Sequence, residues 1–195
     1  MRRVCVFCGS RTGGPAYVEA AKQFGAALVR HGWGLVYGGG HIGLMGVVAD
    51  SMLALGGHVT GVIPKFLEAR ELAHRSVQEL HIVDSMHARK ALMAEKSDAF
   101  VALPGGIGTA EEFFEILTWR QLGLHSKPVA VWNVAGFFDP LVAWLDHMAA
   151  EGFVHPCDQN LLLFENDLET LLDKLSTARS ENVTPTDSKP LIPDS

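Results

Sequence analysis

The chain has 195 residues, of which 48% are hydrophobic and 19% charged, and its formal net charge is −6. That length fits one ordinary domain with a sizeable core, and the acidic balance excludes a protein that binds nucleic acid through a basic face. No apolar run approaches the roughly 18 residues of a membrane span, and the N-terminal apolar stretch is too short for a signal peptide. Three cysteines cannot build a disulfide framework. We therefore expect a cytoplasmic protein away from membranes.

Short apolar runs alternate with longer helical patterns along the chain. Strands are expected over residues 4–8, 34–38, 58–63, 80–84, 98–103, 128–133 and 161–164, and helices over residues 15–31, 43–56, 86–96, 109–122, 138–150 and 167–178. Most of the short runs are continuously apolar, which is typical of strands covered on both faces. The sequence therefore predicts an α/β fold, a doubly wound parallel sheet with helices on both faces. We expect one domain over residues 1–178 and a disordered tail, rich in Ser, Thr and Pro, over residues 179–195.

Glycine-bearing turns follow three of the expected strands, at residues 8–14, 37–46 and 104–109. Ligands of parallel sheets bind beyond the carboxyl ends of the strands, so these turns locate the expected site. The second turn contains G-x-G-x-x-G at Gly38, Gly40 and Gly43, but no acidic residue ends the next strand, which disfavours a dinucleotide cofactor. None of the turns ends in Gly-Lys-Ser/Thr, so triphosphate hydrolysis is not expected either.

The cysteine and histidine patterns indicate neither a redox pair nor a metal site. Cys5 and Cys8 stand three residues apart in or beside a strand, should point to opposite faces, and are expected to be small core side chains. The nine histidines show none of the usual zinc-binding spacings, so no metal is implied.

The third turn, PGGIGT, leads directly into an expected helix. Gly105, Gly106 and Gly108 permit backbone angles that let amide N–H groups converge on an anion. Thr109 and Glu112 match the capping box T-x-x-E, and in that interpretation Glu112 would only satisfy a backbone donor.

Two features favour a functional role instead. Glu111, Glu112 and Glu115 gather near one end of a helix that is otherwise apolar, and we expect this helix to be buried on the sheet and in a subunit interface. Carboxylates at such a position are costly unless they are used. Arg89 and Lys90 follow another strand and would supply counter-charges to a phosphate and a glutamate.

The motifs PGGIGTAEE, SMHARK, VFCGS and YGGGHIGLMG together resemble the LONELY GUY family, the cytokinin-activating phosphoribohydrolases once labelled lysine decarboxylase-like. The resemblance runs from about residue 4 to residue 153, and its PGGxGTxxE signature is specific. It implies a Rossmann-like fold, a homodimer and no cofactor. The implied reaction is hydrolysis of the N-glycosidic bond of a purine nucleoside 5'-monophosphate, releasing the base and ribose 5-phosphate.

By this resemblance Arg89 and Glu112 match the catalytic pair, and both are also expected to contact the substrate. The other implied substrate contacts are Ser10, Gly39, Glu71, Lys90, Gly105, Gly106, Ile107, Gly108, Thr109, Ala110, Glu111 and Thr118. The chain departs from the family pattern at three places. It has CGSR where CGSS is commoner, ARE where PRE precedes the glutamate, and Ile107 where many plant members carry Tyr, and these changes bear on which base is preferred.

The chemistry fits the pair, because glycosidic hydrolysis develops positive charge on the sugar ring. We expect Glu112 to face the ribose, and Arg89 to orient it or to assist departure of the base. Three alternatives stay open: a pyridoxal-dependent decarboxylase using Lys90, a nucleotide or cofactor carrier without turnover, and AMP rather than a cytokinin nucleotide as the working substrate.

Overall fold

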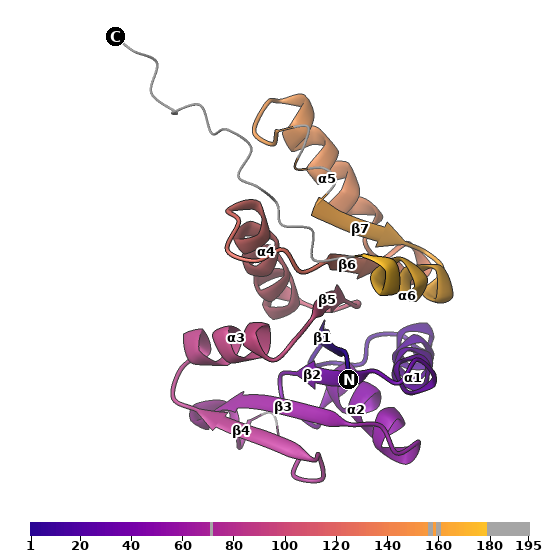
Figure 1. Ribbon diagram of the computed structural model, residues 1–195, viewed down its shortest axis with the longest axis vertical. Coiled ribbons are helices and arrows are strands. Elements are labelled where there is room, and N and C mark those ends of the chain that lie inside the picture. The colour runs from indigo at the N-terminus through magenta and orange to yellow at the C-terminus, as the bar shows by residue number, and fades with distance from the viewer. Residues whose placement is uncertain (71, 156–157, 159–160, 179–195) are drawn as a thin grey trace.

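The computed structural model describes residues 1–70, 72–155, 158 and 161–178 (Figure 1). The expected tail at 179–195 and the expected substrate contact Glu71 lie outside these described residues. Within them, no helix has both the length and the apolar character needed to cross a membrane.

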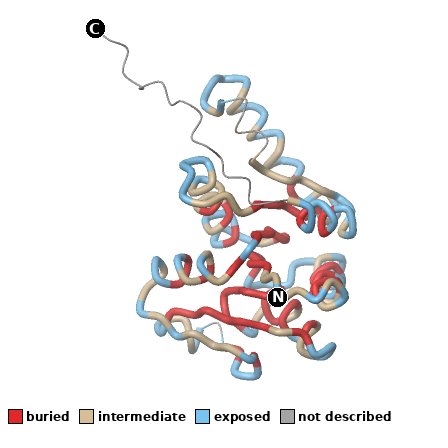
Figure 2. Tube along the Cα trace, in the orientation of Figure 1, coloured by how far each residue is buried: buried red, intermediate tan, exposed pale blue. Residues whose placement is uncertain are grey.

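Seven parallel strands form one sheet, in the order β4-β3-β2-β1-β5-β6-β7. The strands are β1 (Arg3–Phe7), β2 (Gly34–Tyr37), β3 (Val59–Pro64), β4 (Glu79–Val83), β5 (Ala99–Ala102), β6 (Val129–Trp132) and β7 (Leu162–Glu165). Every predicted strand is confirmed to within two residues. The inner strands are buried while β4 and β7 at the edges are mostly half-exposed (Figure 2), which explains why the inner runs read as continuously apolar.

Helices connect the strands on both faces of the sheet, as Figure 1 shows. The α-helices are α1 (Pro15–Arg30), α2 (Gly43–Ala54), α3 (Met86–Glu95), α4 (Ile107–Gln121), α5 (Asp139–Ala150) and α6 (Leu168–Thr177), and short 3-10 helices lie at η1 (Lys65–Leu67) and η2 (Val134–Gly136). Helices α1, α2 and α6 cover one face, whereas α3 and α4 cover the other. The predicted Rossmann-like α/β architecture is thus confirmed.

Cys5 lies in β1 and Cys8 directly follows it, and their side chains pack on opposite faces of the sheet. Cys5 packs in the core under α3 and α4, whereas Cys8 packs in the core under α1 and α2. Burial raises the pKa of both thiols well above the ordinary range, so both stay protonated and unreactive at neutral pH. The prediction that these residues are core side chains on opposite faces is confirmed.

The chain reverses its direction of winding at β1, which lies between β2 and β5 in the sheet. The connection after β1 leads to α1 on one face, and the connection after β5 leads to α4 on the opposite face. The two connections therefore diverge and leave a crevice at the carboxyl ends of β1 and β5. In open α/β sheets this is the position at which ligands bind.

Candidate functional site

The three glycine turns contact one another backbone to backbone. The amide of Gly9 donates to the carbonyl of Pro104 at 3.1 Å, and the amide of Leu44 donates to the carbonyl of Gly9 at 2.9 Å. A Cβ on Gly9 would lie 3.3 Å from the Cα of Gly105, and a Cβ on Gly43 would lie 2.2 Å from the carbonyl carbon of Ser10. Glycine is thus needed here so that the turns can pack together, which holds the rim of the crevice in one arrangement.

Helix α4 begins earlier than the sequence predicts, and this changes the interpretation of Glu112. Gly106 is the N-cap, no side chain caps the helix, and the first helical hydrogen bond runs from the amide of Ala110 to the carbonyl of Gly106 at 3.1 Å. Thr109 lies in the first turn with its hydroxyl in the space beside Gly105. The predicted capping box is therefore wrong, and Glu112 does not serve as its carboxylate.

The start of α4 has the character of an anion site. The amides of Gly106, Ile107, Gly108 and Thr109 precede the first helical hydrogen bond, so the helix itself gives them no carbonyl partner. These N–H groups and the positive end of the helix dipole together favour a phosphate. Ile107 is 90% exposed at this position.

Arg89 lies in the first turn of α3, and the protein backbone holds its guanidinium in place. Nε donates to the carbonyl of Val62 at 3.1 Å, and Nη2 donates to the carbonyl of Gly38 at 2.8 Å, in a residue that is only 4% exposed. A Cβ on Gly38 would lie 2.1 Å from Nη2. Gly38, the first glycine of the G-x-G-x-x-G pattern, therefore makes room for an arginine rather than for a dinucleotide.

Glu112 faces this guanidinium across a small pocket. Its Oε1 lies 4.0 Å from Nη1 of Arg89, and its side chain is 13% exposed. We call this 230 Å³ space the carboxylate pocket; it is lined by Cys8, Ser10, Met45, Leu67, Met86, Arg89, Gly106, Ile107, Gly108, Thr109, Glu111 and Glu112. A partly desolvated carboxylate beside the start of α4 can stabilise a cation while the helix amides hold an anion.

A second pocket of 430 Å³ lies against the first glycine turn. This loop pocket is lined by Gly9, Ser10, Arg11, Thr12, Gly13, Tyr17, Leu44, Pro104, Gly105, Gly106, Ile107 and Phe137. Ser10, Gly106 and Ile107 line both pockets, so the two spaces adjoin at the start of α4. Together they provide room for a ligand larger than a ribose phosphate.

Lys90 is committed to two glutamates of α4. Its Nζ donates to Glu111 and, at 2.9 Å, to Oε2 of Glu115. Burial lowers the pKa of Lys90, but the hydrogen bonds to both carboxylates outweigh this effect and leave the pKa raised. Lys90 is among the lining residues of neither pocket, and a protonated amine is no nucleophile for a Schiff base.

The remaining predicted contacts are spread over other places. Ala110 lines a 190 Å³ apolar pocket together with Phe137 and Phe138, which lie between η2 and α5, and with Leu141 of α5. Gly39 packs against β3, with a positive φ of 76°. Thr118 lines a different, apolar groove and is not among the lining residues of the carboxylate pocket.

Sequence reasoning missed four lining residues of the carboxylate pocket: Met45, Leu67, Met86 and Cys8, the last of which was expected only in the core. The sequence spacing could have indicated that one of them, Met86, lies beside Arg89. Met86 stands one helical turn before Arg89, and its sulfur lies 3.8 Å from Nη1.

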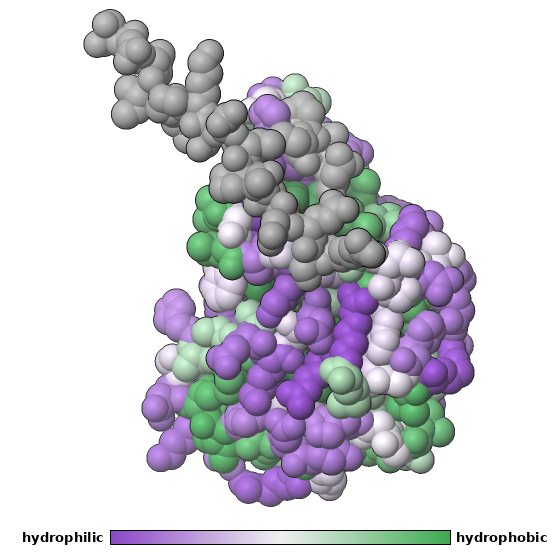
Figure 3. Space-filling model, in the orientation of Figure 1, coloured by the Kyte–Doolittle hydropathy of each residue, from purple (hydrophilic) through white to green (hydrophobic). Residues whose placement is uncertain are grey.

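A 370 Å³ apolar groove runs between α4 and α5; we call it the α4–α5 groove. It is lined by Phe114, Leu117, Thr118, Gln121, Val142, Trp144, Leu145, Asp146, Met148, Val154, Asp158, Leu161, Leu162 and Phe164. Helix α5 has no buried residue although its sequence is largely apolar, and Trp144 is 53% exposed. In Figure 3 hydrophobic side chains lie beside α4, and further hydrophobic and hydrophilic areas are interspersed over the rest of this face.

A family model and several named proteins are similar to this chain over most of its length. A family model described as "Possible lysine decarboxylase" matches residues 45–175. A probable cytokinin riboside 5'-monophosphate phosphoribohydrolase from Oryza sativa subsp. japonica is 50% identical, over 89% of this chain and 77% of that protein. A cytokinin riboside 5'-monophosphate phosphoribohydrolase from Rhodococcoides fascians is 49% identical over 86% of each chain. One from Arabidopsis thaliana is 46% identical, over 89% and 82%.

Solved structures share the fold at lower identity. The molybdenum cofactor binding protein from Rippkaea orientalis has a TM-score of 0.68 and 18% identity, covering 90% of this chain and 95% of that one. The molybdenum cofactor carrier protein from Chlamydomonas reinhardtii has a TM-score of 0.66 and 22% identity, with the same coverage. At these identities the likeness shows the fold alone.

The ion-pair cluster of Lys90 predicts a pH dependence of stability. Because its pKa is raised in the folded protein, Lys90 stabilises the fold below the ordinary lysine pKa of about 10.4, and this contribution is lost as the pH rises through the folded-state value. We expect the free energy of unfolding to fall less steeply above about pH 10 in Lys90→Met than in the wild type. Urea unfolding at several alkaline pH values measures this, with Lys22→Met, at an exposed lysine of α1, as the matched control. Identical pH profiles for Lys90→Met and the wild type would contradict the assignment.

Proposed function

We propose that this chain, which belongs to the LONELY GUY family of cytokinin riboside 5'-monophosphate phosphoribohydrolases, is a hydrolase that cleaves the N-glycosidic bond of purine nucleoside 5'-monophosphates. The relatives so named are 46–50% identical over most of the chain. One observation carries the proposal: a partly buried carboxylate, Glu112, faces a fixed guanidinium, Arg89, beside a helix start suited to phosphate. Cytokinin nucleotides and AMP share the purine ribose 5-phosphate that these groups would recognise.

The 5'-phosphate is proposed to bind at the start of α4. The amides from Gly106 to Thr109 would donate to its oxygens, and Ser10 borders the same space from the first glycine turn. Neither pocket has a Walker lysine, and Lys90 is held by Glu111 and Glu115. The site therefore suits one phosphate better than a di- or triphosphate.

The ribose is proposed to lie in the carboxylate pocket with its anomeric carbon toward Glu112. As the bond between this carbon and the base nitrogen lengthens, positive charge develops on the sugar ring, and the carboxylate stabilises that charge. A water oxygen then bonds to the anomeric carbon, which yields ribose 5-phosphate, and the base departs with a proton. Glu112 would also orient that water.

Arg89 is proposed to position the Glu112 carboxylate and the ribose phosphate while its own guanidinium stays fixed. Two backbone carbonyls fix its guanidinium, and Nη1 is the nitrogen that faces Glu112. A planar, forked cation can hold the carboxylate and a ribose or phosphate oxygen together, which a lysine ammonium cannot do with the same geometry.

The family label of a lysine decarboxylase finds no support in the site. Lys90 is the lysine closest to the motifs, and its two carboxylate partners favour the charged amine. A catalytic Schiff-base lysine needs the opposite, a lowered pKa. A carrier role without turnover rests only on structures below 25% identity, which inform on the fold and not on activity.

We further propose a cytoplasmic homodimer in which each chain forms one domain over residues 1–178. The α4–α5 groove and the exposed face of α5 supply an apolar surface of the kind that a partner subunit covers. Thr118 lines that groove, so dimerisation would explain how a residue outside the carboxylate pocket of one chain reaches substrate in the other. The free, buried thiols of Cys5 and Cys8 fit a reducing compartment.

Replacement of Glu112 by Gln tests the catalytic assignment. Glu112→Gln should lower turnover on the order of 10²-fold or more, the usual scale for a positioned electrostatic or acid–base group, while the urea midpoint stays close to that of the wild type. Turnover is measured as adenine and ribose 5-phosphate released from AMP. Glu115→Gln is the matched control, because it removes a charge one turn along α4 outside the pocket and should keep most of the activity. Near-normal turnover of Glu112→Gln would refute the role.

Substrates without a 5'-phosphate test the proposed anion site. Each hydrogen bond to a charged group contributes about 1.5 to 3 kcal/mol, so loss of two or three should lower kcat/KM for adenosine roughly 10²- to 10⁵-fold relative to AMP. Part of the loss should appear in kcat, since binding of a remote group positions the reacting centre. Liberated adenine is measured from adenosine, AMP and ATP, and ATP should also be poor. Equal cleavage of adenosine and AMP would show that the glycine turn is only structural.

Light scattering tests the proposed homodimer. The wild type at micromolar concentration should have twice the chain mass of 21.1 kDa. Leu145→Asp places a charge in the α4–α5 groove at a half-buried position of α5, where the fold should tolerate it, and should shift the protein to the monomer mass. A monomeric wild type would disprove the dimer.

A further inference from the structure

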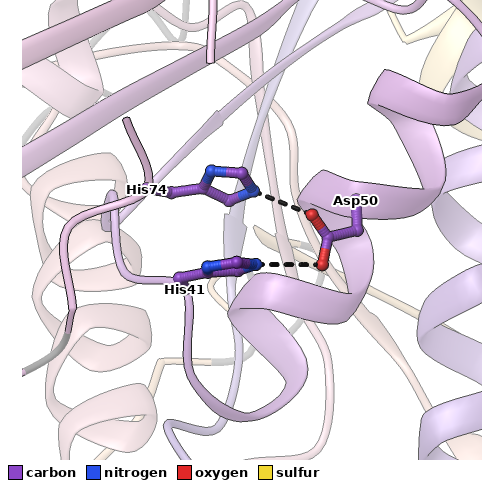
Figure 4. Close-up of side chains that lie close together, drawn as sticks. All are labelled: His41, Asp50 and His74. Carbon is purple, nitrogen blue, oxygen red and sulfur yellow. Dashed lines mark hydrogen bonds and ion pairs between the residues drawn. The ribbon is translucent and has the colours of Figure 1, made fainter. Parts of the chain in front are cut away.

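Two histidines and an aspartate converge outside both pockets (Figure 4). His41 comes from the turn after β2, Asp50 from α2, and His74 from the segment after η1. Nε2 of His41 lies 3.2 Å from Oδ2 of Asp50, and Nε2 of His74 lies 2.9 Å from Oδ1 of the same carboxylate. The two imidazole rings stack with centroids 4.1 Å apart and an angle of 29° between their planes.

We infer that His41, Asp50 and His74 form a binding site for a divalent first-row metal ion of the Zn²⁺ type. One ligand atom from each residue can be chosen so that all of them lie within 4.8 Å of one another. Tetrahedral zinc with bonds of about 2.0 to 2.2 Å holds its ligand atoms about 3.3 Å apart. Small side-chain shifts thus convert the observed cluster into three ligands of one ion, and imidazole and carboxylate are suitable donors for it.

Burial differs among the three residues in the manner of an open metal site. His74 is 3% exposed, whereas the side chains of His41 and Asp50 are 49% and 55% exposed. The buried imidazole anchors the site from the protein side, and the exposed side lets an ion enter. A water molecule completes the tetrahedron there as the fourth ligand.

Backbone hydrogen bonds hold the two histidines in register. The amide of His41 donates to the carbonyl of Leu72 at 3.0 Å, and the amide of His74 donates to the carbonyl of Gly39 at 2.9 Å. Gly40 and Ala73 form an antiparallel bridge between the same segments. The ligands on both segments are therefore preorganised before the ion binds, which lowers the cost of ordering them.

The ion would hold neighbouring segments of the chain together and would not be part of the reaction centre. None of the three ligands lines the carboxylate pocket or the loop pocket. Leu67 does line the carboxylate pocket, and it lies in the same connection as His74, between β3 and β4. An ion at this cluster joins that connection to the turn after β2 and to α2.

A second histidine–carboxylate cluster in the chain provides the internal contrast. Nε2 of His58 and Nε2 of His81 each lie 3.3 Å from an oxygen of Glu79. Arg3 and Lys96 also contact this carboxylate, at 3.3 and 3.5 Å, so two cations already occupy the place that an ion would take. In the described part of the chain, Asp50 forms its ion pairs with the two imidazoles and with no lysine or arginine.

Cobalt titration of the untagged, chelator-treated protein tests the site. We expect one Co²⁺ per chain, with a visible d–d absorption of the intensity that four-coordinate cobalt gives, and displacement of Co²⁺ by Zn²⁺. At a Zn²⁺ concentration of about 100 times its Kd, the melting temperature should rise by roughly 5 to 10 °C, and EDTA should reverse the rise.

Three variants decide whether the ion binds at this cluster. His41→Ala and Asp50→Asn remove ligands at half-exposed positions and should each weaken Co²⁺ binding by about 10- to 100-fold or more. His81→Ala, in the contrasting cluster, should bind Co²⁺ like the wild type. Circular dichroism checks that each variant is folded, and if one is not, the other two still decide.

Absence of Co²⁺ binding by the wild type would overturn the inference, as would equal binding by His41→Ala, Asp50→Asn and the wild type. The readout is metal binding and does not depend on nucleotide hydrolysis, so its failure would leave the proposed function untouched.

Discussion

A guanidinium bound to the backbone of β3 and of the turn after β2 is the interaction on which the site depends. Burial of a charge is costly unless hydrogen bonds replace the lost water, and Arg89 obtains them from the carbonyls of Val62 and Gly38. The arrangement needs a residue without a side chain at position 38, because the guanidinium fills that volume. It also fixes the cation at the carboxyl edge of the sheet, where it faces Glu112. Glu112 lies on α4, which follows β5, and β5 lies on the other side of β1 from β2 and β3. The two groups come from α3 and α4, and the sheet sets the distance between them.

The glycines divide into two physical roles that a sequence pattern does not separate. Gly9, Gly43 and Gly105 allow backbone to approach backbone, so that the turns after β1, β2 and β5 hold one another. Gly106 and Gly108 have open space where a Cβ would be, so their role is to start α4 and expose its amides. If this rim binds the phosphate as proposed, its amides need little reorganisation when the anion arrives.

The order of elements could be read from the sequence because strands buried on both faces leave continuous apolar runs, and all seven runs became strands. The start of α4 could not be read correctly, since Thr109 and Glu112 imitate a capping box while Thr109 is buried against Gly105. The contact of Arg89 with Gly38 spans 51 positions, and the links of Asp50 to His41 and His74 span 9 and 24. No local period encodes such separations; they follow from the strand order, which only the fold reveals.

The central position of β1 has a consequence for how the chain acquires its structure. β1 pairs with β2 on one side, where Val4 stands opposite Leu35, and with β5 on the other, where Val4 stands opposite Ala99. The first four strands can assemble as a half-sheet while β1 still exposes its second row of backbone N–H and C=O groups. That edge stays open until residues near 100 have left the ribosome. Because non-local strand pairing is slow and open edges pair with other chains, nascent molecules are most vulnerable to aggregation in this interval.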